Sequence, residues 1–175
     1  NGLMHIILQQ GWQDDQFIAN RTEGFDEFKT VIERYTPDMV SQITGIPVEQ
    51  LYQAAEILGA NKPMAVIWAM GITQHITGVR NVMDLANLQM LLGNMGIPGG
   101  GVNPLRGQNN VQGACDMGGL PNVYPGYQSV TLEASRKKFE AAWGTHLSEK
   151  VGLTVTQMMP AAAEGRIKAL YILGE

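Results

Sequence analysis

Apolar residues recur at helical spacing in the first third of the chain. One face follows the i, i+3, i+4, i+7 pattern of a helix and consists of Phe28, Val31, Ile32 and Tyr35. Thr36 followed by Pro37 is typical of an N-cap and a first helical position, and Gly45 is a stop signal. Pro47 opens another helix, which ends near residues 59–61. Its apolar face is Val48, Leu51, Tyr52, Ala55 and Leu58.

Two short apolar runs predict strands. Residues 64–69 follow a proline, and residues 169–173 lie at the end of the sequence. Continuous apolar runs of this length are typical of strands buried on both faces of a parallel sheet. Further helices are predicted at residues 79–92, 133–143 and 154–163.

This order of elements predicts one α/β domain over residues 1–175. We expect three layers, with a mainly parallel sheet flanked by helices and with both apolar runs as inner strands. Open α/β sheets bind ligands at the carboxyl ends of their strands, which here are residues 70–74 and 174–175. Because the sequence stops on a core strand, we expect it to be a fragment of a larger polypeptide.

The glycines are concentrated in one segment. The chain contains 21 glycines, and ten of them lie between Gly93 and Gly126. Only Arg106 and Asp116 carry formal charge there. Loops longer than about 12–15 residues are usually functional or disordered, and the low charge argues against disorder. We therefore predict a long, ordered, glycine-rich loop at about residues 93–127, with its backbone lying against a ligand or another part of the protein.

Composition excludes several classes of function. The net charge is −4, so no basic excess favours nucleic acid or an anionic membrane. The single cysteine, Cys115, excludes an internal disulfide and a CxxC motif. No apolar run approaches the roughly 20 residues of a transmembrane helix.

Two places offer binding chemistry, each with a structural alternative. Residues 71–74 follow a predicted strand, where free backbone N–H groups favour phosphate oxygens, but the segment is not a GxGxxG motif and a plain turn is the favoured interpretation. Arg106 is the only cation of the glycine-rich segment. Its planar guanidinium matches a carboxylate with two hydrogen bonds. It could instead bind loop carbonyls, so both interpretations stand.

Three other reactive residues favour a structural interpretation. We expect Cys115 to be a buried, inert thiol and Asp116 to be a turn or cap residue. His75 follows the first strand and is expected to be a surface or capping residue. The histidines show no metal-ligand spacing, so no metal ligand is predicted.

The glycine-rich segment resembles a known signature. Residues 101–118, GVNPLRGQNNVQGACDMG, are similar to the signature segment of the formate dehydrogenase catalytic subunit, a molybdopterin oxidoreductase. Residues 70–75 resemble the cofactor loop of that family, and residues 88–98 resemble the helix and turn before the signature. Residues 121–127 resemble its continuation, and residues 171–175 a strand that leads to a further pterin contact.

The resemblance implies roles for individual residues. Arg106 matches the arginine that holds the formate carboxylate, and Gln108 matches a neighbour in the same pocket. Contacts with the pterin dinucleotides are implied for Gly71, Gln74, Gly107, Gly174 and Glu175. The reaction implied is oxidation of formate to carbon dioxide at a molybdenum or tungsten centre with two molybdopterin guanine dinucleotides. The electrons then pass to a 4Fe-4S iron–sulfur cluster.

The sequence also departs from the whole family pattern. The metal-ligating selenocysteine or cysteine with its adjacent histidine is absent, and Cys115 does not match it. The cluster cysteines and the electron-relay lysine are absent too. We therefore expect the fragment to bind no cofactor and to be inactive alone.

The expected partners are formate, the remaining domains of the same subunit and electron-transfer subunits. The compartment stays open, with the cytoplasm favoured. Two alternatives remain: an oxidoreductase for another oxyanion such as nitrate, and a non-catalytic nucleotide-binding module.

Overall fold

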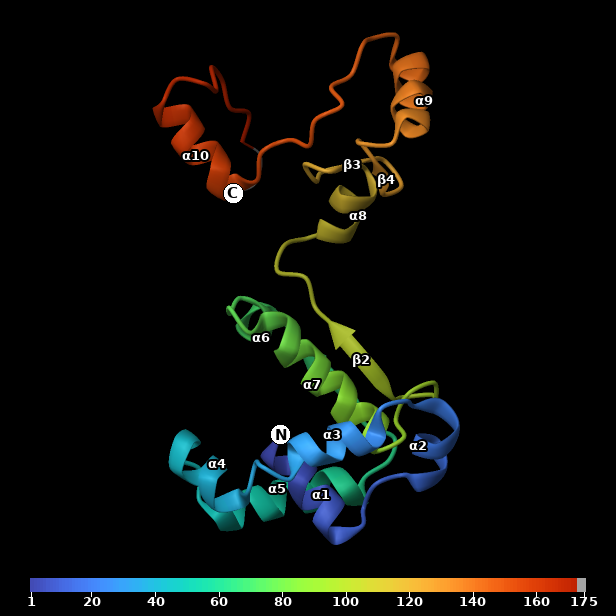
Figure 1. Cartoon of the computed structure of the whole chain (residues 1–175), viewed down its shortest axis with the longest axis vertical. Coiled ribbons are helices and arrows are strands. Elements are labelled where there is room, and N and C mark those ends of the chain that lie inside the picture. The colour runs from blue at the N-terminus through green and yellow to red at the C-terminus, as the bar shows by residue number, and fades with distance from the viewer. Residues whose placement is uncertain (173–175) are drawn as a thin grey trace. The chain divides into compact units, whose positions relative to one another are not determined.

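The computed structural model describes residues 1–172 and divides the chain into two compact units (Figure 1). Unit 1 covers residues 1–107, and unit 2 starts at Gln108. The helices of unit 1 are α1 (Gly2–Gln10), α2 (Asp15–Arg21), α3 (Phe25–Ile32), α4 (Pro37–Thr44), α5 (Val48–Ala60), α6 (Met70–Thr73) and α7 (Gly78–Leu91). Its strands are β1 (Ala65–Trp68) and β2 (Gly101–Pro104). Unit 2 contains α8 (Val111–Asp116), β3 (Val123–Tyr124), β4 (Gln128–Ser129), α9 (Glu133–Trp143) and α10 (Val155–Ala163).

Local sequence signals explain where the helices begin and end. The Thr36 hydroxyl accepts a hydrogen bond from the Met39 N–H at 3.3 Å, and Pro37 occupies the first turn of α4. Gly45 ends α4 in the left-handed conformation, with φ 74°. The predicted helices α3, α4, α5, α7, α9 and α10 are all confirmed, within one to a few residues at their ends.

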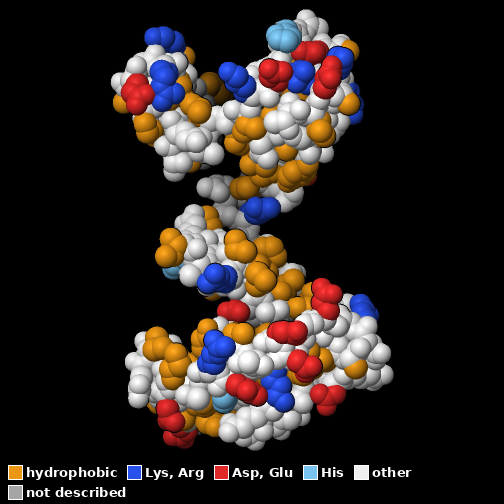
Figure 2. Space-filling view, in the orientation of Figure 1, with side chains coloured by type: hydrophobic (Ala, Val, Ile, Leu, Met, Phe, Trp, Pro, Cys, Tyr) orange, Lys and Arg blue, Asp and Glu red, His pale blue; other side chains and the backbone are white. Residues whose placement is uncertain are grey.

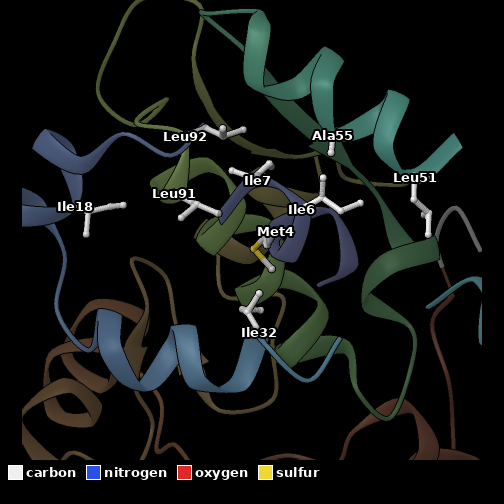
Figure 3. Packing of buried hydrophobic residues seen from close by; sticks show 9 residues of the cluster. All are labelled: Met4, Ile6, Ile7, Ile18, Ile32, Leu51, Ala55, Leu91 and Leu92. Atoms are coloured by element: carbon white, nitrogen blue, oxygen red, sulfur yellow. The ribbon is translucent and has the colours of Figure 1, made fainter. Parts of the chain in front are cut away.

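The core of unit 1 is built around α1, which packs against α3, α4 and α5 (Figure 3). Ile6 and Ile7 of α1 are fully buried. The whole cluster is Met4, Ile6, Ile7, Ile18, Ile32, Leu51, Ala55, Leu91 and Leu92. Burial of one such aliphatic side chain contributes about 1.5–3 kcal/mol. No helix was predicted at α1 or α2, although α1 supplies the centre of this core.

The parallel sheet confirms the α/β class, but its second strand is not the predicted one. β1 pairs in parallel with β2, and α7 packs against both strands. β2 lies inside the segment that was predicted to be a loop, and α8 and β3 lie there too. The segment is therefore a loop interrupted by short elements, and its prolines and glycines lie mostly in the turns between these elements.

The prediction that β1 is buried on both faces is wrong. Trp68 is 8% exposed, whereas the neighbouring Ile67 is 63% exposed. Successive side chains of a strand point to opposite faces. The sheet has two strands among residues 1–172, and the side of β1 that carries Ile67 is not covered there.

The predicted strand at residues 169–173 is not observed in its described part. Residues 169–172 have no strand conformation, and Tyr171 is 90% exposed. A strand needs a neighbour for its backbone hydrogen bonds, and no sheet within residues 1–172 includes this segment. Leu173 lies outside the described residues.

Unit 2 has its own small aromatic core. β3 and β4 form an antiparallel hairpin that presents Tyr124 to α9. The ring centroids of Tyr124 and Phe139 are 4.8 Å apart, and those of Phe139 and Trp143 are 5.0 Å apart. Val130 is buried in the same cluster.

α10 begins with a capping box formed by Thr154 and Gln157.

Asp14 joins three segments of unit 1 through its carboxylate and its backbone N–H. Asp14 accepts a hydrogen bond from the Phe17 N–H at 2.8 Å and pairs with Lys62 Nζ at 2.7 Å. Its own N–H donates to the Leu91 carbonyl at 2.8 Å. The Lys62 ammonium, followed by the Phe17 N–H, holds the pKa of Asp14 below its usual value. This junction fixes α2 against the end of α7.

We expect Gly93→Ala to destabilise unit 1 more than an ordinary glycine substitution. Gly93 has φ 66°, and a Cβ there would overlap the Asp14 carboxylate. The left-handed backbone alone costs about 1–2 kcal/mol for alanine, and the overlap adds roughly 1–3 kcal/mol. Urea unfolding of the chain measures the sum.

Gly45→Ala is the matched control for this substitution. Gly45 has φ 74°, and a Cβ there meets nothing within 4 Å. It therefore reports the backbone cost without the overlap. Equal losses of stability in the two variants would contradict the role assigned to the Asp14 junction.

Candidate functional site

The carboxyl ends of β1 and β2 form one edge of the parallel sheet. Trp68 of β1 stands opposite Pro104 of β2. The pairing continues beyond the strands, because the Leu105 N–H donates to the Trp68 carbonyl at 2.7 Å. Parallel strands leave a sheet on the same side, so residues 70–74 and residues 105–107 emerge at the same edge.

A buried glutamine holds the other end of this strand pair. Gln89 of α7 has no exposed surface, and its Nε2 donates to the Met64 carbonyl at 2.8 Å and to the Gly101 carbonyl at 2.7 Å. These two carbonyls lie at the starts of β1 and β2. The buried Asn94 adds a bond, since its Oδ1 accepts from the Met64 N–H at 3.1 Å. The register that defines the carboxyl edge is thus anchored from α7.

The turn after β1 is held by hydrogen bonds within the turn and from α7. The Gln74 N–H donates to the Met70 carbonyl at 2.8 Å and closes the short helix α6. A ring nitrogen of His75 lies 2.8 Å from the Gly71 carbonyl oxygen. The Asn81 side chain of α7 donates to the Ile72 carbonyl at 2.9 Å. A segment that is held in this way presents its backbone in a fixed position.

The glycines at this edge differ in their surroundings. A Cβ on Gly71 would meet nothing within 4 Å, so its backbone is open to a ligand. A Cβ on Gly107 would lie 2.6 Å from the terminal carbon of Met70. Gly107 therefore allows the chain after β2 to approach the chain after β1.

The predicted site residues divide into three groups. Gly71, Gln74, Arg106 and Gly107 all follow β1 or β2 at the carboxyl edge in unit 1, and Arg106 is exposed. Gln108 opens unit 2, where it is exposed three residues before α8. Gly174 and Glu175 lie outside the described residues. Hydrophobic side chains of α6 and α7 are also exposed, among them Met70, Val79 and Met83. Figure 2 shows hydrophobic side chains on the surface of this part of the molecule.

The other candidates match their expected places only in part. Cys115 is partly exposed and is not the buried thiol that was predicted, because the six-residue α8 leaves it incompletely covered. Asp116 does not cap a helix; its carboxylate accepts a hydrogen bond from Gln112 at 3.0 Å. His75 is exposed and bonds the turn after β1, as predicted. No cluster of three potential metal ligands occurs within residues 1–172.

Sequence reasoning missed two polar groups. Gln89 was treated as one position of a largely apolar helix, and its signal was a glutamine on the buried face of that helix. Tyr127 adopts a left-handed backbone, with φ 57°, and bonds Gln112. No spacing rule predicts a left-handed tyrosine.

Comparison with known proteins identifies the family of the chain. The family model for molybdopterin oxidoreductases matches residues 1–175, so the chain belongs to the molybdopterin oxidoreductase family.

Two similar proteins are formate dehydrogenases by name. The chain is 47% identical to the F420-dependent formate dehydrogenase 1 subunit alpha of Methanococcus maripaludis over 175 residues, which is 100% of the chain and 26% of that protein. It is also 47% identical to formate dehydrogenase H of Escherichia coli over 176 residues, which is 100% of the chain and 25% of that protein. The chain thus spans about a quarter of the length of these relatives.

No helix within residues 1–172 is long and apolar enough to cross a membrane.

We expect Gln89→Leu to loosen the strand pair. The substitution replaces the amide with an apolar side chain of similar volume and leaves the Met64 and Gly101 carbonyls without their amide donor. Loss of each of the two hydrogen bonds costs about 0.5–1.5 kcal/mol, so the free energy of unfolding should fall by about 1–3 kcal/mol. Amide hydrogen exchange in β1 and β2 should become faster, and the opening free energy calculated from it should fall by a similar amount.

Gln53→Leu on α5 is the matched control. Gln53 is exposed and bonds Glu49 at 3.3 Å, so its loss should change stability by less than about 0.5 kcal/mol. If Gln89→Leu unfolded at the same urea concentration as this control, the anchoring role would be refuted.

Proposed function

We propose that this chain is the part of a formate dehydrogenase catalytic subunit that binds formate and contacts part of the pterin cofactor. The observation that supports this most directly is the carboxyl edge of the β1–β2 pair, where Arg106 and residues 70–74 emerge together. The names and the 47% identity of the relatives support formate as the substrate.

The reaction converts formate into carbon dioxide, one proton and two electrons. When bound, a molybdenum or tungsten centre with two molybdopterin guanine dinucleotides supplies the two-electron acceptor, and an iron–sulfur cluster carries the electrons onward. The task of the present residues is to hold formate, to orient its C–H bond and to contact the dinucleotide.

Arg106 binds the formate carboxylate in this proposal. Formate has one carbon and little apolar surface, so its affinity must come from charge and paired hydrogen bonds. A guanidinium provides both and fixes the orientation of the carboxylate plane. The bond from the Leu105 N–H to Trp68 fixes the backbone immediately before Arg106. Gln108 supplies a neutral hydrogen bond near the same substrate.

The turn after β1 fits a dinucleotide contact. The open space at Gly71 lets a ligand approach the peptide backbone, and the held turn ends at Gln74. Gly107 is packed on Met70 and contributes through its backbone. Gly174 and Glu175 complete the proposed cofactor contacts.

The rest of the catalytic machinery is assigned to other parts of the parent subunit. A selenocysteine or cysteine at the metal and the cluster cysteines would lie there, since Cys115 is the only cysteine of this chain. The chain then acts with the remaining domains of its subunit and with electron-transfer subunits.

The purified 175-residue chain should show no formate-dependent dye reduction, even with the cofactor added, because these groups are absent. The full-length parent enzyme is the positive control in the same assay. Turnover by the metal-free chain would refute this division of labour.

In the full-length enzyme, Arg106→Lys should raise KM for formate and lower kcat. Lysine keeps the charge but loses the planar pair of donors, so the C–H bond is no longer aimed correctly. Loss of a charge-assisted bond costs about 1.5–3 kcal/mol, which lowers kcat/KM by at least about tenfold. Steady-state kinetics normalised to metal content measure this effect.

Arg80→Lys on the exposed surface of α7 serves as the control and should leave kcat/KM unchanged. Gln108→Ala should reduce kcat/KM less than Arg106→Lys, because it removes a neutral partner. An unchanged kcat/KM per metal in Arg106→Lys, with lower metal content or stability, would assign Arg106 a structural role instead.

A further inference from the structure

Tyr127 has a backbone conformation that its own residue type disfavours. Tyr127 has φ 57° and the preceding Gly126 has φ 72°. Both lie in the turn between β3 and β4. Consecutive positive φ values in a hairpin turn favour glycine, asparagine or aspartate. An aromatic residue there costs free energy, and such conformations persist where the surroundings enforce them. The side chain is 47% exposed, so burial of the ring is not the main compensation.

The hydroxyl of Tyr127 makes a specific bond to α8. Gln112 Nε2 donates to the Tyr127 hydroxyl at 2.9 Å and to Asp116 Oδ1 at 3.0 Å. The Gly126 N–H donates to the Asp116 carbonyl at 2.7 Å. The hairpin turn is thereby bonded to the first turn of α8 through Gln112 and to its last residue through Asp116.

α8 depends on such contacts for its position. It has six residues, and helices this short are unstable alone. Its N-cap, Asn110, is itself left-handed, with φ 55°, and none of its residues is buried. The bond from Gln112 to Tyr127 therefore ties the start of this helix to the hairpin turn. Gln108 lies two residues before that N-cap.

We infer that Tyr127 is a positioning residue for Gln108, the residue of unit 2 that the proposed function assigns to formate binding. Its hydroxyl fixes Gln112 and the start of α8, and the start of α8 fixes Gln108, which lies four residues before Gln112. This inference deepens the proposed function and rests on it. The turn adopts its unfavourable conformation because that conformation brings the hydroxyl to Gln112.

The test is Tyr127→Phe in the full-length enzyme. This change removes one oxygen and keeps the ring and the turn. We expect KM for formate to rise about threefold to tenfold, as for loss of one neutral hydrogen bond. KM for the electron acceptor and metal content should stay unchanged. Simple destabilisation would reduce the amount of active enzyme without changing KM for formate.

Two further variants make the test specific. Tyr124→Phe removes a hydroxyl from the same hairpin, where it lies 3.5 Å from the Ser148 carbonyl, and should leave KM for formate unchanged. Gln112→Ala should raise KM for formate, and adding Tyr127→Phe to it should cause little further increase, because both changes break the same bond. Additive effects, or an equal effect of Tyr124→Phe, would overturn the inference.

Amide hydrogen exchange separates this inference from the proposed function. If the wild-type enzyme does not oxidise formate, the proposed function fails. The positioning role still predicts that Tyr127→Phe accelerates exchange at residues 108–116 and that Tyr124→Phe does not. Unchanged KM for formate in an active Tyr127→Phe enzyme, or unchanged exchange in these residues, would overturn the role of Tyr127.

Discussion

The buried amide of Gln89 is the interaction on which the arrangement of unit 1 depends. It bonds the carbonyls at the starts of both parallel strands from a helix that also belongs to the hydrophobic core. A two-stranded parallel sheet has little stability by itself. The register of β1 and β2, and with it the position of the carboxyl edge, is therefore set by α7 rather than by the strands alone.

That register joins folding to the proposed chemistry. Trp68 and Pro104 stand side by side, so the two segments that leave the sheet begin as neighbours. One segment offers an open backbone at Gly71, and the other carries Arg106. A cationic donor and an accessible backbone at the same edge suit a small carboxylate beside a larger anionic cofactor, which agrees with the family to which the chain belongs.

Local signals in the sequence predicted most helices and β1, because caps, prolines and apolar spacing act within a few residues. Gly45 and Thr36 mark α4 for this reason. The pairing of β1 with residues 101–104 could not be predicted, because it depends on a contact between segments more than 30 residues apart. For the site, chemistry alone left Arg106 open and favoured a plain turn at residues 71–74, and their roles were assigned from the resemblance to the family signature. Their common edge follows from that pairing. Gln89 and Tyr127 were not predicted as important residues, because their roles depend on tertiary hydrogen bonds.

The most direct test of the account is an experimental structure of the full-length enzyme with formate bound. It should retain the pairing of Trp68 with Pro104. Two guanidinium nitrogens of Arg106 should each lie within about 3 Å of one formate oxygen. It should also place the dinucleotide against the Gly71 backbone. Formate held by other cations, with Arg106 bonded only to protein carbonyls, would contradict the account.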